Sequence, residues 1–251
     1  MYANSQINVG GTTTFDIGND VNIKGGVINT NKAQGVIGGN VNIESLQDTA
    51  TYDSKQKNMG FTADIDLKGG AGSSLSLNGG KTDIDADYKA VGAQSGIFAN
   101  EADLVTEGKG NFIGGVFTTS ADAQANGKSN IVFKQGVTSE DIKNSTTYDG
   151  DAIQVGVSLG MTENKPQANS NGLGYGTDGD SDSSVTKAGI TGITGNRDIT
   201  TDNHEEYAGV LDNVFNATRV NKELGAQSQI TKEFGKKRLE EPEYYCILLQ
   251  Y

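Results

Sequence analysis

Cysteine, proline and tryptophan are nearly absent from this chain of 251 residues, which has one Cys, two Pro and no Trp. The single thiol, Cys246, excludes a disulfide framework and a thiolate metal cluster. Hydrophobic residues make up only 34% and aromatic residues 7%, which is too little bulk for one wide globular core. The same amount suffices for a narrow core repeated along an axis, and 35 glycines supply corners for one.

Positive charge and long apolar runs are also scarce. The formal net charge is −12, so a phosphate backbone is repelled and we expect no nucleic-acid partner. The basic group Lys236-Lys237-Arg238 falls at the end of an expected helix, where cations complement the helix dipole. No run of about 18 apolar residues occurs, so we expect no transmembrane segment. Met1 opens directly onto a strand-like pattern without a signal peptide, which favours an internal piece of a longer exported chain over a cytosolic protein.

Two internal repeats are the main positive feature. Val21-Asn22-Ile23 returns 20 residues later as Val41-Asn42-Ile43, each copy preceded by Gly and Asn nearby. Short strands between Gly and Asn corners fill residues 1–47, and a unit of about 20 residues fits one rung of a parallel β-helix. In that register Asn22 stacks on Asn42, and ladders of this kind satisfy side-chain amides along the stack.

The second repeat has an offset of 96 residues and marks longer strands. It aligns Thr49, Thr51, Tyr52, Asp53, Gly60 and Phe61 with Ser145, Thr147, Tyr148, Asp149, Gly156 and Val157. Strict alternation around Phe61, Ile84 and Val155 predicts half-buried strands, joined at 67–75 by a loose hairpin connection. Residues 48–160 therefore combine rungs with longer, projecting strand pairs.

The remainder divides into three segments. Residues 161–202 have the Gly, Ser, Asn and Asp content of a flexible linker. Residues 203–238 switch to a helical period, with Asn203 and Glu206 as an expected capping box and an apolar face that resumes at Ile230 and Phe234. The first part of that face comprises Val210, Val214, Ala217, Asn221 and Leu224. Residues 239–251 match neither pattern.

Few residues suggest chemistry, and each has a plainer interpretation. His204 is the only histidine and is expected in a surface turn; pairing with Cys246 as a nucleophile requires the tail to fold back. Asp178-Gly179-Asp180-Ser181-Asp182 offers oxygen ligands but lacks the spacing of a calcium loop. Asp83, Asp85 and Asp87 share one strand face, where carboxylates either protect an exposed sheet or, less simply, act in sugar cleavage. We expect no catalytic, cofactor-binding or metal-binding residue and no enzyme activity.

Together these motifs resemble the haemagglutinin repeats of filamentous haemagglutinin-type exoproteins. The Gly-Asn-Val-Asn-Ile rungs and the Thr-Tyr-Asp block followed by Val91–Ile97 carry the resemblance, and Leu211–Phe234 is similar to the helical stretch before the toxin of contact-dependent growth inhibition effectors. The resemblance covers residues 1–238. It implies two-partner secretion through an outer-membrane partner, a bacterial surface or secreted location, and a receptor or glycan on a target cell.

The resulting prediction is a mostly β protein. A right-handed parallel β-helix with projecting strand pairs spans 1–160, a linker 161–202, a helical pre-toxin-like segment 203–238 and an atypical tail 239–251. The resemblance implies a stalk fragment of a larger adhesin or toxin-delivery exoprotein. Two alternatives stay open, namely a β-helix that binds or cleaves carbohydrate, and a toxin whose activity lies in the C-terminal segment.

Overall fold

The chain folds into two interleaved compact units in the computed structural model, which describes residues 3–64, 73–162 and 165–240. The chain passes between the units several times, so each unit is assembled from separate segments. The first unit comprises Met1–Ala50, Tyr88–Thr146 and Asp182–Asp212, and the second comprises Thr51–Asp87, Thr147–Ser181 and Asn213–Tyr251. Each unit is described by itself.

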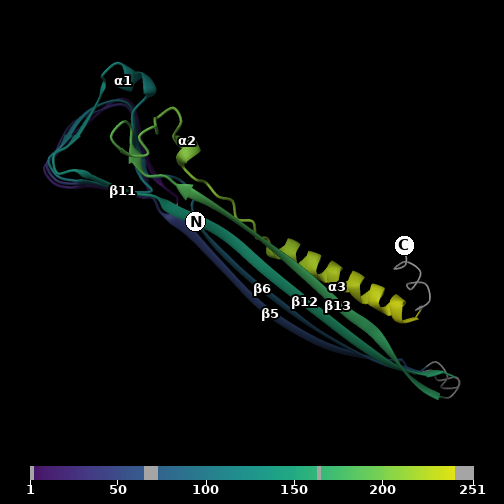
Figure 1. Cartoon of the computed structure of the whole chain (residues 1–251). Helices are drawn as coiled ribbons and strands as arrows, with labels where there is room; N and C mark the ends of the chain where they lie inside the picture. The colour runs from purple at the N-terminus through teal and green to yellow at the C-terminus, as the bar shows by residue number, and fades with distance from the viewer. Residues whose placement is uncertain (1–2, 65–72, 163–164, 241–251) are drawn as a thin grey trace, which may run out of the picture. The chain divides into compact units, whose positions relative to one another are not determined.

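The first unit is a stack of parallel strands in two sheets (Figure 1). One sheet has the order β1 (Ser5–Ile17), β3 (Gly26–Ile37), β7 (Gly96–Thr106), β9 (Val116–Thr118), β14 (Gly189–Ile190) and β15 (Thr194–Gly195), with β10 (Ser129–Phe133) also paired to β7. The other contains β2 (Val21–Lys24), β4 (Val41–Glu44), β8 (Gly110–Ile113) and β11 (Val137–Glu140). Neighbours pair in parallel except β14 and β15, which are antiparallel.

The 20-residue repeat produces this stack directly. Val21 pairs with Val41, Asn22 with Asn42 and Ile23 with Ile43, so identical residues lie above one another as the sequence predicts. Alternate side chains point inward and form one continuous apolar core. Its buried members are Phe15, Ala33, Ile37, Val41, Ile43, Ile97, Ala99, Ala102, Leu104, Phe112, Phe117, Ile131, Ala188 and Ile190.

An asparagine ladder runs along the outside of the smaller sheet. Asn42 Nδ2 donates to Asn22 Oδ1 at 2.8 Å, and Asn111 Nδ2 donates to Asn42 Oδ1 at 2.7 Å. Thr138 Oγ1 continues the row by donating to Asn111 Oδ1 at 2.9 Å. The predicted Asn22–Asn42 contact is therefore confirmed, and the ladder extends over all four strands of this sheet.

The second unit is a four-stranded sheet of long strands, in the order β13 (Lys165–Thr186), β12 (Ile142–Thr162), β6 (Ser74–Val91) and β5 (Gln47–Asp64). Ser74 at the start of β6 donates to Asp64 at the end of β5, so these neighbours run in opposite directions. The 96-residue repeat is thereby explained, because it places β5 and β12 at equivalent points of two successive strand pairs. Most of the expected hairpin connection at 67–75 lies outside the described residues.

Three helices complete the described chain. α1 (Ala121–Ala125) and α2 (His204–Tyr207) belong to the first unit, and α3 (Ala217–Glu240) belongs to the second. The expected capping box at Asn203 is wrong, because its side chain accepts from the Thr200 N–H and makes no cap bond to α2. Asn216 caps α3 instead, since its Oδ1 accepts from Arg219 N at 3.0 Å.

The expected linker at 161–202 is corrected for residues 165–186, which form β13. The region contains the alternating glycines Gly172, Gly174 and Gly176, which read as loop composition in the sequence. In the structure they lie in a strand against the backbone of α3, where a side chain has no room. The expected boundary at 160 also divides an element, because β12 continues to Thr162.

Candidate functional site

His204 packs in the first unit rather than standing in a surface turn. Its ring centroid lies 4.3 Å from that of Phe98, and burial lowers the pKa of the imidazole below 6.5. The two rings are tilted by 48°, and this half-buried contact marks His204 as a packing residue. Cys246, its candidate partner, lies outside the described residues.

The two acidic motifs serve as strand surface. Ile84 and Ala86 are buried while Asp85 and Asp87 are exposed, which confirms the predicted alternation on β6. In the other motif, Asp180 and Asp182 accept hydrogen bonds from the next residue's backbone N–H. Within the described part of the chain, no group of three or more His, Cys, Asp or Glu side chains is arranged to hold a metal ion.

Asp178 instead joins a polar cluster beneath the first turn of α3. The hydroxyl of Tyr148 donates to Asp178 Oδ1 at 3.0 Å and accepts from Arg219 Nη2 at 2.8 Å. The guanidinium also lies 5.4 Å from the centroid of the Tyr148 ring, in cation–π range. Burial is the largest factor that raises the pKa of Tyr148, so the phenol stays protonated and bridges the sheet to the helix.

The apolar contact beside this cluster uses both copies of the repeated tyrosine. Phe215, just before α3, has its ring centroid 4.9 Å from that of Tyr52 and 5.7 Å from that of Tyr148. Tyr52 and Tyr148 are equivalent in the 96-residue repeat. Val220 and Leu224 of α3 are fully buried in the same core, with Ile84, Ala86 and Ala152 of the sheet. The repeat thus supplies a matched pair of aromatic contacts for one segment.

Glycines allow α3 to approach the sheet at backbone distance. A Cβ atom on Gly174 would lie 2.1 Å from the Ser228 carbonyl oxygen, and one on Gly176 would lie 2.8 Å from that of Leu224. Both distances are shorter than side chains tolerate, so glycine is required at these positions of β13.

α3 also closes the outer edge of β13 with two side chains one turn apart. Gln227 Oε1 accepts from the Thr177 N–H at 2.9 Å, and Thr231 Oγ1 accepts from the Tyr175 N–H at 2.7 Å. β13 is the last strand of its sheet, so these N–H groups lack a strand partner in the described sheet. The helix side chains replace the bonds that a further strand would make.

The sheet face opposite the Val220–Leu224 contact carries exposed apolar side chains. Phe61 is 73% exposed, although the alternation of β5 predicts burial; that prediction is wrong because no described element covers this face at Phe61. Met59, Phe61, Leu77, Val155 and Val157, with Gly60, Asn78 and Gly79, line a shallow groove there. We call this set the apolar groove.

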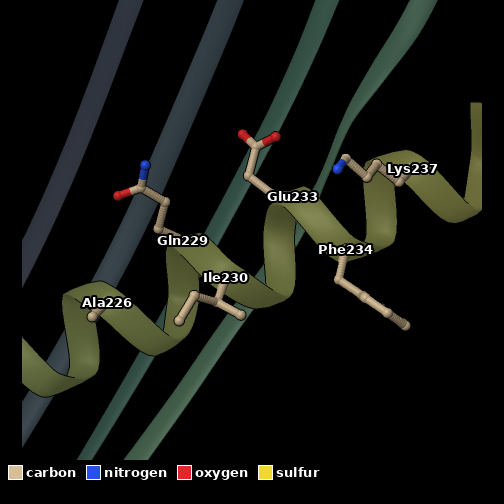
Figure 2. A pocket seen from close by; sticks show the side chains of 6 residues that line it. All are labelled: Ala226, Gln229, Ile230, Glu233, Phe234 and Lys237. Atoms are coloured by element: carbon tan, nitrogen blue, oxygen red, sulfur yellow. The ribbon is translucent and has the colours of Figure 1, made fainter.

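The outer side of α3 is a second exposed apolar surface. Figure 2 shows Ile230 and Phe234 one turn apart on α3, and they are 67% and 55% exposed. The expected helical period over 203–238 is wrong for residues 208–216, which form no helix, so Val210 and Val214 of the predicted apolar face precede α3. α3 packs on the sheet through its earlier part, where Val220 and Leu224 are buried. Lys237 follows in the last turns, where the sequence places the basic group. None of the described helices is long and apolar enough to cross a membrane.

Sequence reasoning missed the residues that fix α3 to the sheet. Tyr148 and Asp178 were present in recognised motifs, but their contact depends on Arg219, which no periodicity singles out. The alternating glycines of β13 were the available signal, because Gly at every second position of a strand indicates a close backbone approach.

Comparison with known proteins finds a family model that matches the first part of the chain. The model of the haemagglutinin repeat matches residues 1–59. The chain is 39% identical over 100 residues to the tRNA nuclease CdiA of Yersinia mollaretii, and 26% identical over 99 residues to the deoxyribonuclease CdiA of Yersinia pseudotuberculosis. Each match covers 39% of this chain but only 3% and 9% of the respective relative. No solved structure matches the chain significantly.

The matched repeat lies where β1 to β4 stack, so sequence and geometry agree on the same segment. The curated relatives are far longer than this chain, and the matched segments span less than a tenth of their length. The chain carries a haemagglutinin-repeat region of the filamentous haemagglutinin and contact-dependent growth inhibition type.

Proposed function

We propose that the chain is a structural segment in the stalk of a secreted or surface-exposed exoprotein that acts in adhesion or contact-dependent toxin delivery. The carrying observation is the register of the rungs, in which Val21-Asn22-Ile23 stacks on Val41-Asn42-Ile43. A parallel stack of similar rungs gives length and stiffness, and it can be extended by adding units. We also propose that this stack winds as a right-handed β-helix, as the resemblance implies.

The proposal includes a route and a location. The relatives named CdiA support export by two-partner secretion, with an outer-membrane protein as the secretion partner. A receptor or glycan on a target cell is then the partner of the assembled exoprotein. The formal charge of −12 suits a soluble, solvated stalk.

Surface labelling of intact cells tests the location. A short epitope inserted after Asn126, in the exposed turn that leads to Gly127, leaves the rungs intact because nothing lies within 4 Å of a Cβ built on Gly127. In the bacterium that encodes the chain, we expect the antibody to bind unpermeabilised cells. Deletion of the secretion partner should abolish this binding. Labelling only after permeabilisation would refute the proposal.

We propose further that this segment itself is not an enzyme. The relatives are named as nucleases, so the purified chain should be incubated with tRNA and with duplex DNA, with and without Mg²⁺. We expect no cleavage above a buffer control, since the acidic chain repels phosphate. Cleavage that co-purifies with the chain would instead favour a C-terminal toxin activity.

A further inference from the structure

The strand pairs of the second unit lie side by side in the order in which they occur in the sequence. β6, the second strand of the first pair, lies beside β12, the first strand of the next pair. At this junction a Cβ built on Gly79 would lie 3.6 Å from Val155 Cγ2, and Val91 N donates to Asn144 Oδ1 at 3.0 Å. Gly79 lies beside Val155 and the later residue Val91 lies beside the earlier residue Asn144, so β6 and β12 run in opposite directions.

The two outer strands are in opposite situations. β13, like β6, is the second strand of its pair, so its outer edge is where a further strand of the β12 type belongs. α3 occupies that edge through Gln227 and Thr231. The other outer strand, β5, is equivalent to β12, and in the described sheet β6 is its only strand neighbour.

Side chains that line the apolar groove are also more exposed on β5 than on β12. Val155 and Val157, which have a strand on both sides, are 48% and 51% exposed. Their equivalents in β5, Met59 and Phe61, are 93% and 73% exposed. The side chains of β5 therefore have the exposure expected of an internal strand that lacks one of its two neighbours.

We infer that the outer edge of β5 receives an antiparallel strand of the β6 type, supplied by a further copy of the 96-residue block. This inference rests on the proposed stalk function, and it names a further block of the same repeat as the partner of β5. The existing junction fixes the register, because Gly79 of β6 lies beside Val155 and position 155 corresponds to position 59. The incoming strand therefore places its Gly79 equivalent beside Met59 and its Leu77 equivalent near Phe61. α3 ends the sheet at the opposite edge.

Disulfide trapping tests both the partner and the register. The full chain carries Cys246→Ser and Met59→Cys, and the probe is a labelled peptide with the sequence of residues 74–91 and Gly79→Cys. In a glutathione redox buffer we expect the mixed disulfide to form at least tenfold faster than with a peptide that carries Ser76→Cys instead. Met59 is almost fully exposed, so its replacement does not disturb folding.

A matched chain with Val155→Cys in place of Met59→Cys is the control, because this equivalent position already has strands on both sides. It should react with the two peptides at equal, slow rates. Equal rates at Met59→Cys would overturn the inference, and so would disulfide dimers of the chain that outcompete the peptide, since they indicate pairing of two β5 edges. Either result leaves the surface-labelling test of the stalk function unaffected.

Discussion

Replacing Gly174 by alanine tests whether α3 is held by backbone contact with β13. The new Cβ atom would lie 2.1 Å from the Ser228 carbonyl oxygen, which is more than 1 Å too close. The contact involves helix backbone, so it cannot be relieved by a rotamer change. The helix backbone around Ser228 must therefore move away from β13.

Two outcomes set the scale of the expected loss of stability. A small shift that keeps the core intact costs about 1–3 kcal/mol, as overpacking usually does. Complete release of α3 exposes Val220 and Leu224, each of which contributes about 1.5–3 kcal/mol when buried, so these two side chains alone account for about 3–6 kcal/mol. We expect the lower range, because the Arg219–Tyr148 bond lies at the far end of the contact and persists.

Amide hydrogen exchange across residues 217–235, combined with urea denaturation, measures the effect. Gly160→Ala is the control, since nothing lies within 4 Å of a Cβ atom at that position of β12, and it should change stability by less than about 1 kcal/mol. If Gly174→Ala and Gly160→Ala give the same exchange protection in α3, the reasoning from backbone approach is wrong.

Three further substitutions probe other features. Asn42→Ala removes two bonds of the asparagine ladder and should cost about 2 kcal/mol in urea denaturation, against about 1 for Asn22→Ala, which removes one; equal costs would contradict the ladder. Gly225→Ala lies in open space on α3 and should stabilise the chain by about 0.8–1 kcal/mol in thermal unfolding, so a loss of stability would count against a continuous helix there. Burial holds the pKa of His204 below its unfolded value of 6.5, so the unfolded state binds the proton first and stability falls as the pH drops below that value. His204→Gln should remove this slope in pH-dependent denaturation, and an unchanged slope would assign it to other groups.

The parts of the fold that repeat in sequence were predictable, and those that depend on distant contacts were not. Identical triplets 20 residues apart allow one register, so the Asn22–Asn42 contact follows from the sequence alone. The glycines of β13 have the composition of a linker, and only the backbone of α3 lying against them reveals their role. Local pattern also does not tell which faces are covered. The alternation at Phe61 predicts an apolar side but not that this side is left open.

Interruption of the rungs by the long strands has a consequence for the order of folding. β1 and β3 pair across about 20 residues, whereas β3 and β7 pair across 69, because β5 and β6 intervene. Closing the longer loop costs about 1 kcal/mol more in chain entropy, and topology of this kind slows folding. A chain that emerges N-terminus first can form the first two rungs at once. The third rung can pair only after the whole of β5 and β6 has emerged. Each inserted strand pair therefore delays the addition of the next rung to the stack.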